Sequence, residues 1–167
     1  SDGGGLYIKN SEFTINNTEI NNNWSVDGGG IHILESSNGN ISNCQINVNG
    51  SQYGGGVFIE NSTNIEIHSS TISENTASDS GDGKGGGIYI QNSDLNLTNS
   101  SISNNVAESA GGGLSFHDTN NRSTIINNTT IIENVSGHFG GGIYMSGASP
   151  TITNVVISNN LAQNSGA

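Results

Sequence analysis

Few side chains in this sequence could carry acid–base chemistry. Glu60 and His117 share the outward side of one recurring strand position, two repeats apart. Two steps between neighbouring parallel strands span about 10 Å, which exceeds hydrogen-bond reach between acid–base partners. His117 adjoins Asp118, but consecutive strand residues point to opposite faces, so we expect no contact between them. The single arginine, Arg122, lies in the insertion "HDTNNRS", and we therefore predict that the chain is not an enzyme.

The remaining reactive groups also favour structural roles. Cys44 is the only cysteine, and no basic or histidine neighbour in sequence would activate its thiol, so we expect a half-exposed turn residue. Asp79 and Asp82 lie in "ASDSGDGK", a weak candidate for a hard cation because it offers few oxygen ligands. Lys84 lies in "GDGKGGGI", which lacks the Ser or Thr of a phosphate-binding loop. We expect no cofactor.

The elements that position these residues are repeats, each introduced by three consecutive glycines. The triplets begin at residues 3, 28, 54, 85, 111 and 140, and this period is typical of a solenoid. Apolar residues then recur at fixed distances from the triplet; in the fourth repeat they are Ile88, Ile90, Leu95, Leu97 and Ile102. Their spacing by two residues is the period of a strand and not of a helix.

Three short strands cannot bury their inward faces alone, but stacked repeats can. We therefore predict one all-β domain over residues 1–167, a parallel β-helix of about six coils with three short strands per coil. Crossovers between parallel strands are overwhelmingly right-handed, so we expect right-handed winding. At about 4.8 Å per coil the rod is roughly 29 Å long. The glycines would allow a sharp turn with positive φ and close approach between coils.

One asparagine occupies the same position in every repeat, three residues after the last core residue. An amide there can donate to one neighbouring coil and accept from the other, which predicts a buried ladder. An asparagine also tolerates the left-handed conformation of a turn. Three of these residues lie in glycosylation sequons, which is the alternative interpretation. The expected ladder is Asn23, Asn49, Asn75, Asn105, Asn134 and Asn160.

An outward position lies between the two inward residues of the first strand in each repeat. It is mostly aromatic, which indicates either cross-strand packing or an exposed binding stripe for glycans or for lateral association. On the second interpretation, replacing the aromatic residues with serine would abolish binding and leave the fold intact. The position is filled by Tyr7, His32, Phe58, Tyr89, Ser115 and Tyr144.

The repeat resembles a known family. The segments "ISENTA…GGGIYI" and "ISNNVAESAGGGLSF" are similar to the repeats of chlamydial polymorphic outer membrane proteins and related right-handed β-helix surface proteins. The resemblance covers essentially the whole chain and implies an extracellular or cell-surface location with an adhesive or scaffold role. The alternative is a polysaccharide-binding or polysaccharide-degrading β-helix protein of the pectate-lyase kind, which requires a basic residue and acidic calcium ligands on one face.

The net charge and the first and last residues of the sequence indicate which partners to expect. The net charge of −11 with three Lys and Arg residues excludes nucleic acid and anionic membranes as expected partners. The apolar stretches are shorter than the ~20 residues of a membrane span. The closing "NNLAQNSGA" would join the opening "SDGGGLYI" in phase. We therefore expect axial stacking, either between copies of the chain in a filament or onto flanking coils of a longer chain, with glycans or a surface receptor as further partners.

Overall fold

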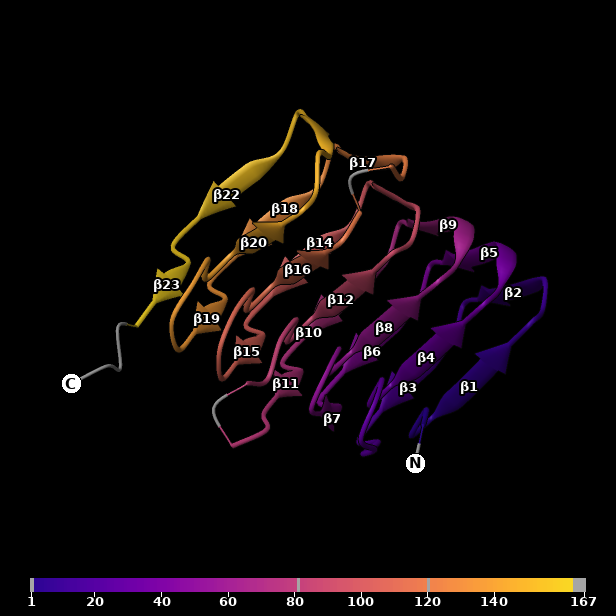
Figure 1. Cartoon of the computed structure of the whole chain (residues 1–167), viewed down its shortest axis with the longest axis horizontal. Coiled ribbons are helices and arrows are strands. Elements are labelled where there is room, and N and C mark those ends of the chain that lie inside the picture. Colours follow the sequence, from indigo (N-terminus) through magenta and orange to yellow (C-terminus); the bar gives the residue numbers. More distant parts are fainter. Residues whose placement is uncertain (1, 81, 120, 164–167) are drawn as a thin grey trace.

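The chain winds into stacked coils of parallel strands in the computed structural model, which describes residues 2–80, 82–119 and 121–163 (Figure 1). The first sheet follows the glycine triplets. Its strands are β1 (Leu6–Lys9), β4 (Ile31–Leu34), β8 (Val57–Glu60), β12 (Ile88–Gln91), β16 (Leu114–His117) and β20 (Ile143–Ser146). Within the second sheet, β5 and β9 absorb the residue inserted into their repeats. That sheet holds β2 (Phe13–Asn16), β5 (Ser37–Ser42), β9 (Thr63–His68), β13 (Leu95–Thr98), β17 (Thr124–Asn127) and β21 (Thr151–Thr153).

Two further sheets complete each coil. The third contains β3 (Glu19–Asn21), β6 (Gln45–Asn47), β10 (Thr71–Ser73), β14 (Ser101–Ser103), β18 (Thr130–Ile132) and β22 (Val156–Ser158). The fourth contains β7 (Gly50–Ser51), β11 (Thr76–Ala77), β15 (Val106–Ala107), β19 (Val135–Ser136) and β23 (Leu161–Ala162). The expected count of three strands per coil is therefore too low, because a two-residue strand follows each ladder asparagine from the second coil onward.

Repeat offsets set the register between coils. Leu6 pairs with Ile31, Ile88 with Leu114, and Ile72 with Ile102, as their distances from the glycine triplets predict. These inward residues form one continuous apolar core. In the interior coils Ile33, Ile59 and Ile90 are fully buried. Among the described residues there is no helix with the length and apolarity needed to cross a membrane.

Each coil turns at residues in the left-handed backbone region. In the fourth coil these are Gly85 (φ 66°), Asn92 (φ 45°), Asn99 (φ 50°) and Asn104 (φ 55°). The ladder asparagines are not among them: the left-handed residue is the one before, such as Asn104 ahead of Asn105. The expectation that the ladder residue itself takes this conformation is wrong, because the preceding residue makes the turn and leaves the amide facing inward.

At each position of a triplet, a side chain would be strained or would clash with the next coil. Gly54 has a φ of 63°, which suits a residue without a Cβ atom. A Cβ atom on Gly55 would lie 2.5 Å from the Gly86 carbonyl oxygen of the next coil. On Gly56 it would lie 2.6 Å from the Gly87 oxygen and 3.0 Å from Nδ2 of Asn75. The triplet therefore brings the first sheet directly against the Asn ladder.

Candidate functional site

The Asn ladder runs through the stack and joins every coil to the next. Nδ2 of Asn75 donates to Oδ1 of Asn105 at 3.0 Å and to the Ile46 carbonyl oxygen at 2.9 Å. Oδ1 of Asn75 accepts both the backbone N–H and the Nδ2–H of Asn49, each at 3.0 Å. Asn49, Asn75, Asn105 and Asn134 are at most 1% exposed. The amides therefore supply the coil-to-coil bonds expected of them, and those of Asn49 and Asn134 are buried away from a glycosyl group.

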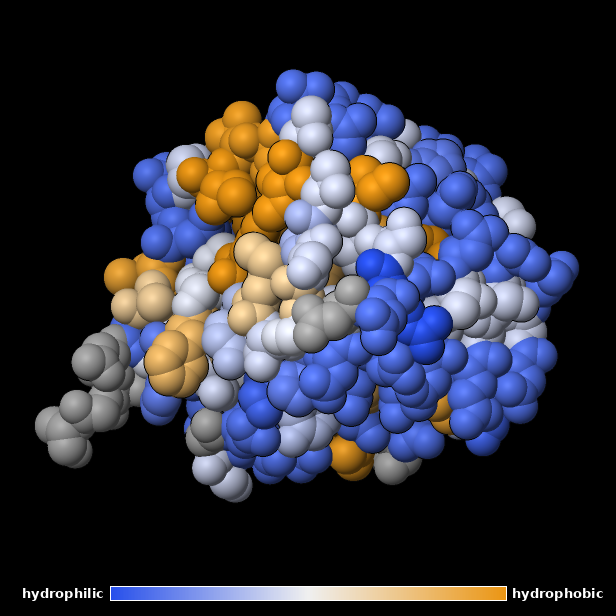
Figure 2. Space-filling model, turned by 45° about the horizontal axis from the view of Figure 1, so that its top comes forward, coloured by the Kyte–Doolittle hydropathy of each residue, from blue (hydrophilic) through white to orange (hydrophobic). Residues whose placement is uncertain are grey.

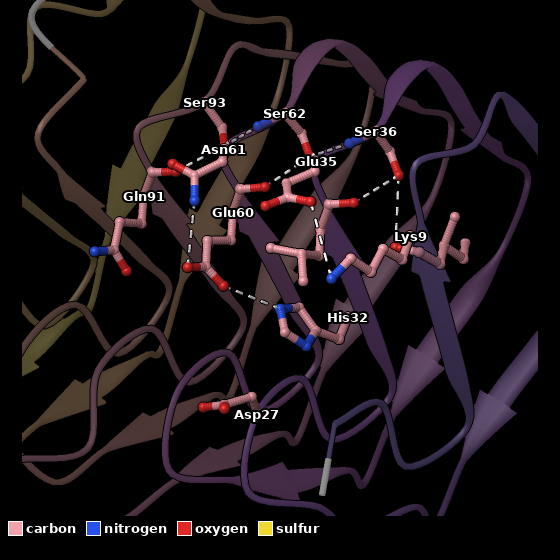
Figure 3. Close-up of polar contacts among 12 residues, drawn as sticks. Lys9, Asp27, His32, Glu35, Ser36, Glu60, Asn61, Ser62, Gln91 and Ser93 are labelled. Atoms are coloured by element: carbon pink, nitrogen blue, oxygen red, sulfur yellow. Dashed lines mark hydrogen bonds and ion pairs between the residues drawn. The ribbon is translucent and has the colours of Figure 1, made fainter.

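Two more ladders lie at the corners after the first and second sheets, and sequence reasoning missed them. In the first five coils the residue after the left-handed one is Ser, Thr or Cys, and in Ser62, Ser70, Ser93 and Ser100 its side chain bonds its own coil and accepts from the previous one. Figure 3 shows the first of these, where Ser36 N–H donates to Ser62 Oγ at 3.0 Å and Ser62 N–H to Ser93 Oγ at 2.9 Å. The recurrence of Ser, Thr or Cys at one offset after each strand in the first five repeats was the available signal.

Cys44 occupies such a corner and is buried at 2% exposure. Its backbone N–H donates to Ser70 Oγ at 3.1 Å, and its Sγ donates to the Ser42 carbonyl oxygen at 3.1 Å. The expectation of a half-exposed turn thiol is wrong, because the thiol takes the corner place that Thr18 and Ser70 hold in the neighbouring coils.

The outward position of the first sheet, here called the ring stripe, consists of Tyr7, His32, Phe58, Tyr89, Ser115 and Tyr144. In the middle of the stack it is covered: His32, Phe58 and Tyr89 are 3 to 5% exposed. His32 stacks on Phe58 with centroids 4.7 Å apart, and Tyr53 packs on Tyr89 at 5.5 Å. Tyr7 is 45% exposed and Tyr144 is half-buried. A continuous exposed binding stripe is therefore not what the structure contains, because neighbouring rings and Tyr53 cover its centre.

His32, in the covered part of this stripe, lies between the acidic side chains of Asp27 and Glu60 (Figure 3). Its Nε2 is 3.4 Å from Oε2 of Glu60, and neither ring nitrogen has hydrogen-bond geometry to a described residue. Burial raises the pKa of the Asp27 carboxyl, and Asp2 and Glu60 raise it further, while His32 opposes them. Protonation of the Asp27 carboxyl is therefore linked to its burial in this cluster.

Asp79 and Asp82, the weak metal candidate, already make other contacts within the protein. Asp82 Oδ1 pairs with Lys84 Nζ at 2.8 Å, and Asp82 Oδ2 accepts the Tyr53 hydroxyl at 3.1 Å. The hydrogen bond from Lys84 lowers the pKa of the Asp82 carboxyl. Asp79 contributes its backbone, since its N–H donates to Glu108 and its carbonyl accepts Asp82 N–H. Within residues 2–80, 82–119 and 121–163, no three metal-ligating side chains gather.

The residues weighed for catalysis are placed as follows. Gln91 lies between Glu60 and His117 in the sheet register, so these two are two coils apart, as expected. His117 Nε2 nevertheless lies 3.6 Å from Asp118 Oδ2. The expectation that they do not meet is wrong, because Asp118 (φ 53°) belongs to the corner and not to the strand. Arg122 donates twice to Asn92 Oδ1, at 3.1 and 3.0 Å.

A comparison with protein families matches residues 1–130 to the model described as "Right handed beta helix region". No curated protein and no solved structure matched the chain. The match covers most of the chain and agrees with the parallel coils, the buried core and the corner ladders. The handedness follows from the same match, so the coils wind to the right. The findings support the β-helix kind of repeat but not the chlamydial surface proteins in particular. The chain belongs to the right-handed β-helix family.

Proposed function

We propose that the chain is a structural and adhesive rod that acts outside the cell or on its surface, and not an enzyme. The observation that carries this proposal is the continuity of its ladders. Four sheets and the Asn ladder pass from coil to coil, and two serine corner ladders join the interior coils, so the residues that recur at fixed offsets are used to hold coils together. Such a rod resists bending because deformation would break several ladders at once.

The groups that could do chemistry are already engaged in structural contacts. Asp82 pairs with Lys84, Arg122 holds Asn92, and His117 lies against Asp118. The composition supports an exported rod that contacts neither nucleic acid nor anionic lipid, because 14 Asp and Glu residues face three Lys and Arg residues.

Location is tested with antibodies against the folded chain on cells of its source. Labelling of intact cells, lost after treatment with external protease, is the expected result. Signal that appears only after permeabilisation would contradict a surface role. Adhesion is tested with beads that carry the chain: they should attach to host or neighbouring cells more strongly than beads that carry albumin, and equal attachment would contradict it.

A second candidate, glycan binding, is favoured by a hollow of about 230 Å³ on the outer face of the second sheet. It is lined by Glu66, Asp94, Asn64 and Asn96, together with the apolar side chain of Ile125. Amides and carboxylates beside an apolar surface suit sugar hydroxyls and ring faces. Asp94 accepts the backbone N–H groups of Ser123 at 2.9 Å and Asn64 at 3.4 Å, which favours binding over hydrolysis. A glycan array compared between the wild type and Asn96→Ala tests this candidate: loss of bound glycans supports it, and an unchanged pattern contradicts it.

A further inference from the structure

We propose that the two ends of the β-helix bind each other, so that copies of this chain stack head to tail. The proposal rests on the structural role proposed above and names its partner, a second copy. The end that carries β20 to β23 is here called the C face, and the end that carries β1 to β3 is called the N face; they lie at opposite ends of the stack (Figure 1).

Within the stack, each corner passes a hydrogen bond in one direction. The residue after the left-handed position donates its backbone N–H to the corner side chain of the following coil. The distances are 3.0 Å for Ser36 to Ser62, 3.1 Å for Cys44 to Ser70, and 3.0 Å for Asn49 to Asn75. The second and third coils therefore donate from all three corners to the coil that follows, and the Asn corner does so in every coil that has a described successor.

At the C face the donors are the backbone N–H groups of Ala148, Val155 and Asn160, beyond which no described coil lies. Nδ2 of Asn160 bonds the Ile131 carbonyl oxygen at 2.8 Å, but the next ladder oxygen, which every earlier ladder asparagine reaches, is not supplied by any described residue. The C face thus presents the donor half of each corner ladder.

At the N face the acceptors are Oγ of Ser11, Oγ1 of Thr18 and Oδ1 of Asn23. Both hydroxyls donate to their own coil, Ser11 to Lys9 and Thr18 to Asn16, which leaves their oxygen lone pairs to accept, as Ser62 does in an interior coil. A hollow of about 300 Å³ opens here beside Thr18, Ile20 and Asn23.

Donors and acceptors have the same spacing along the chain. On the C face, the second donor lies seven positions after the first and the third lies five positions after the second, and the three acceptors of the N face are spaced identically. Because the two coils also share the repeat offsets, one rotation about the axis can align all three corners at once.

Apolar surface on the C face gives this contact a driving force. Met145, Ile152 and Ile157 are 45%, 38% and 50% exposed, although Ile90, Leu97 and Ile102 at the same offsets are fully buried. Figure 2 shows hydrophobic side chains gathered at the end that holds β20 and β22. A coil stacked on this end would bury them against Ile8, Ile15 and Ile20 of the N face.

Charge favours this axial contact over sideways bundling. Residues 140–163 contain no charged side chain, whereas the chain as a whole carries −11. The acidic side chains of the first coil, such as Glu12 and Glu19, would therefore meet a neutral face. Rods placed side by side would bring like charges together.

Pro150 limits the strength of the contact. Its counterpart Leu95 donates its N–H to the Ser123 carbonyl oxygen of the following coil at 3.2 Å, and proline has no such donor. One strand bond is therefore missing from the proposed interface, so stacking should be reversible. A Pro150→Leu variant restores the donor and should shift assembly to lower concentration.

Sedimentation velocity across a micromolar to millimolar series tests the proposal. The wild type should show a sedimentation coefficient that rises with concentration. Ile157→Lys, on the C face, should weaken association about a hundredfold, because stacking would bury an unpaired charge. Ile125→Lys is the matched control, since Ile125 is 40% exposed on the side of the rod, and it should associate like the wild type.

A wild type that stays monomeric over the whole series while its circular dichroism shows a folded β-helix would overturn the proposal, and would assign the end faces to flanking coils or to another partner. Equal loss of association in Ile125→Lys would indicate sideways contact and would overturn it as well. Neither result bears on cellular location, so this proposal and the surface role can fail separately.

Discussion

The buried amide of Asn75 shows how one residue type can hold a solenoid together. Its side chain makes four hydrogen bonds, to Ile46, Asn49 and Asn105. Alanine at this position would leave the backbone N–H of Asn49 and the carbonyl oxygen of Ile46, both on the preceding coil, without the partner that Asn75 supplies. Burial of unpaired polar groups is what makes such a loss costly.

We expect Asn75→Ala to lower the free energy of unfolding by about 3 kcal/mol, measured by urea denaturation followed by circular dichroism. Asn96→Ala is the control, because Asn96 lies on the outer side of β13 and should shift stability by no more than about 0.5 kcal/mol. Equal effects of the two variants would contradict a stabilising role for the ladder.

Asp27 should make stability depend on pH. Burial raises the pKa of its carboxyl above the ordinary value of 3.8, so the folded state binds the proton more tightly than the unfolded state. The contribution to stability is then greatest below the unfolded pKa and is lost as pH rises through the folded pKa. Asp27→Asn should therefore raise the urea midpoint near neutral pH and leave it almost unchanged near pH 3. The same gain at both pH values would contradict this assignment.

The strands of the first sheet show how far sequence reasoning reaches. Triplet positions and apolar offsets predict β1, β4 and β12 and their register, because inward residues must align to bury the core. The fourth sheet could not be predicted from the sequence, because two-residue strands such as β11 (Thr76–Ala77) are too short to show an alternation of apolar and polar residues. Burial of the ring stripe could not be predicted either. Tyr53 covers Tyr89 from a separate segment, and only the folded coil brings the two rings together.

Within this sheet, Phe58→Ser should lower the free energy of unfolding much more than Tyr7→Ser. Phe58 is 4% exposed and packs against His32, Tyr53 and Tyr89, so its loss should cost about 3 kcal/mol of unfolding free energy. Tyr7 is 45% exposed at the edge of the stack, and its replacement should cost less than about 1 kcal/mol. Comparable melting curves for both variants would indicate that the ring stripe is an open surface after all.

At the level of the whole molecule, the repeat explains both the stiffness of the rod and its expected contacts. The Asn ladder joins each coil to the next, and the two end coils present matching halves of that ladder. The variable side chains lie on the sides of the rod, where the hollow beside Glu66 and Asp94 is located. A structural role would thus use the ends for assembly and the sides for recognition.

Electron microscopy of the purified chain over a concentration series tests this account most directly. The account predicts unbranched filaments one rod wide, with an axial subunit repeat of roughly 29 Å from six coils at about 4.8 Å each, and longer filaments for Pro150→Leu. Discrete short particles at every concentration, or irregular side-by-side bundles, would contradict it.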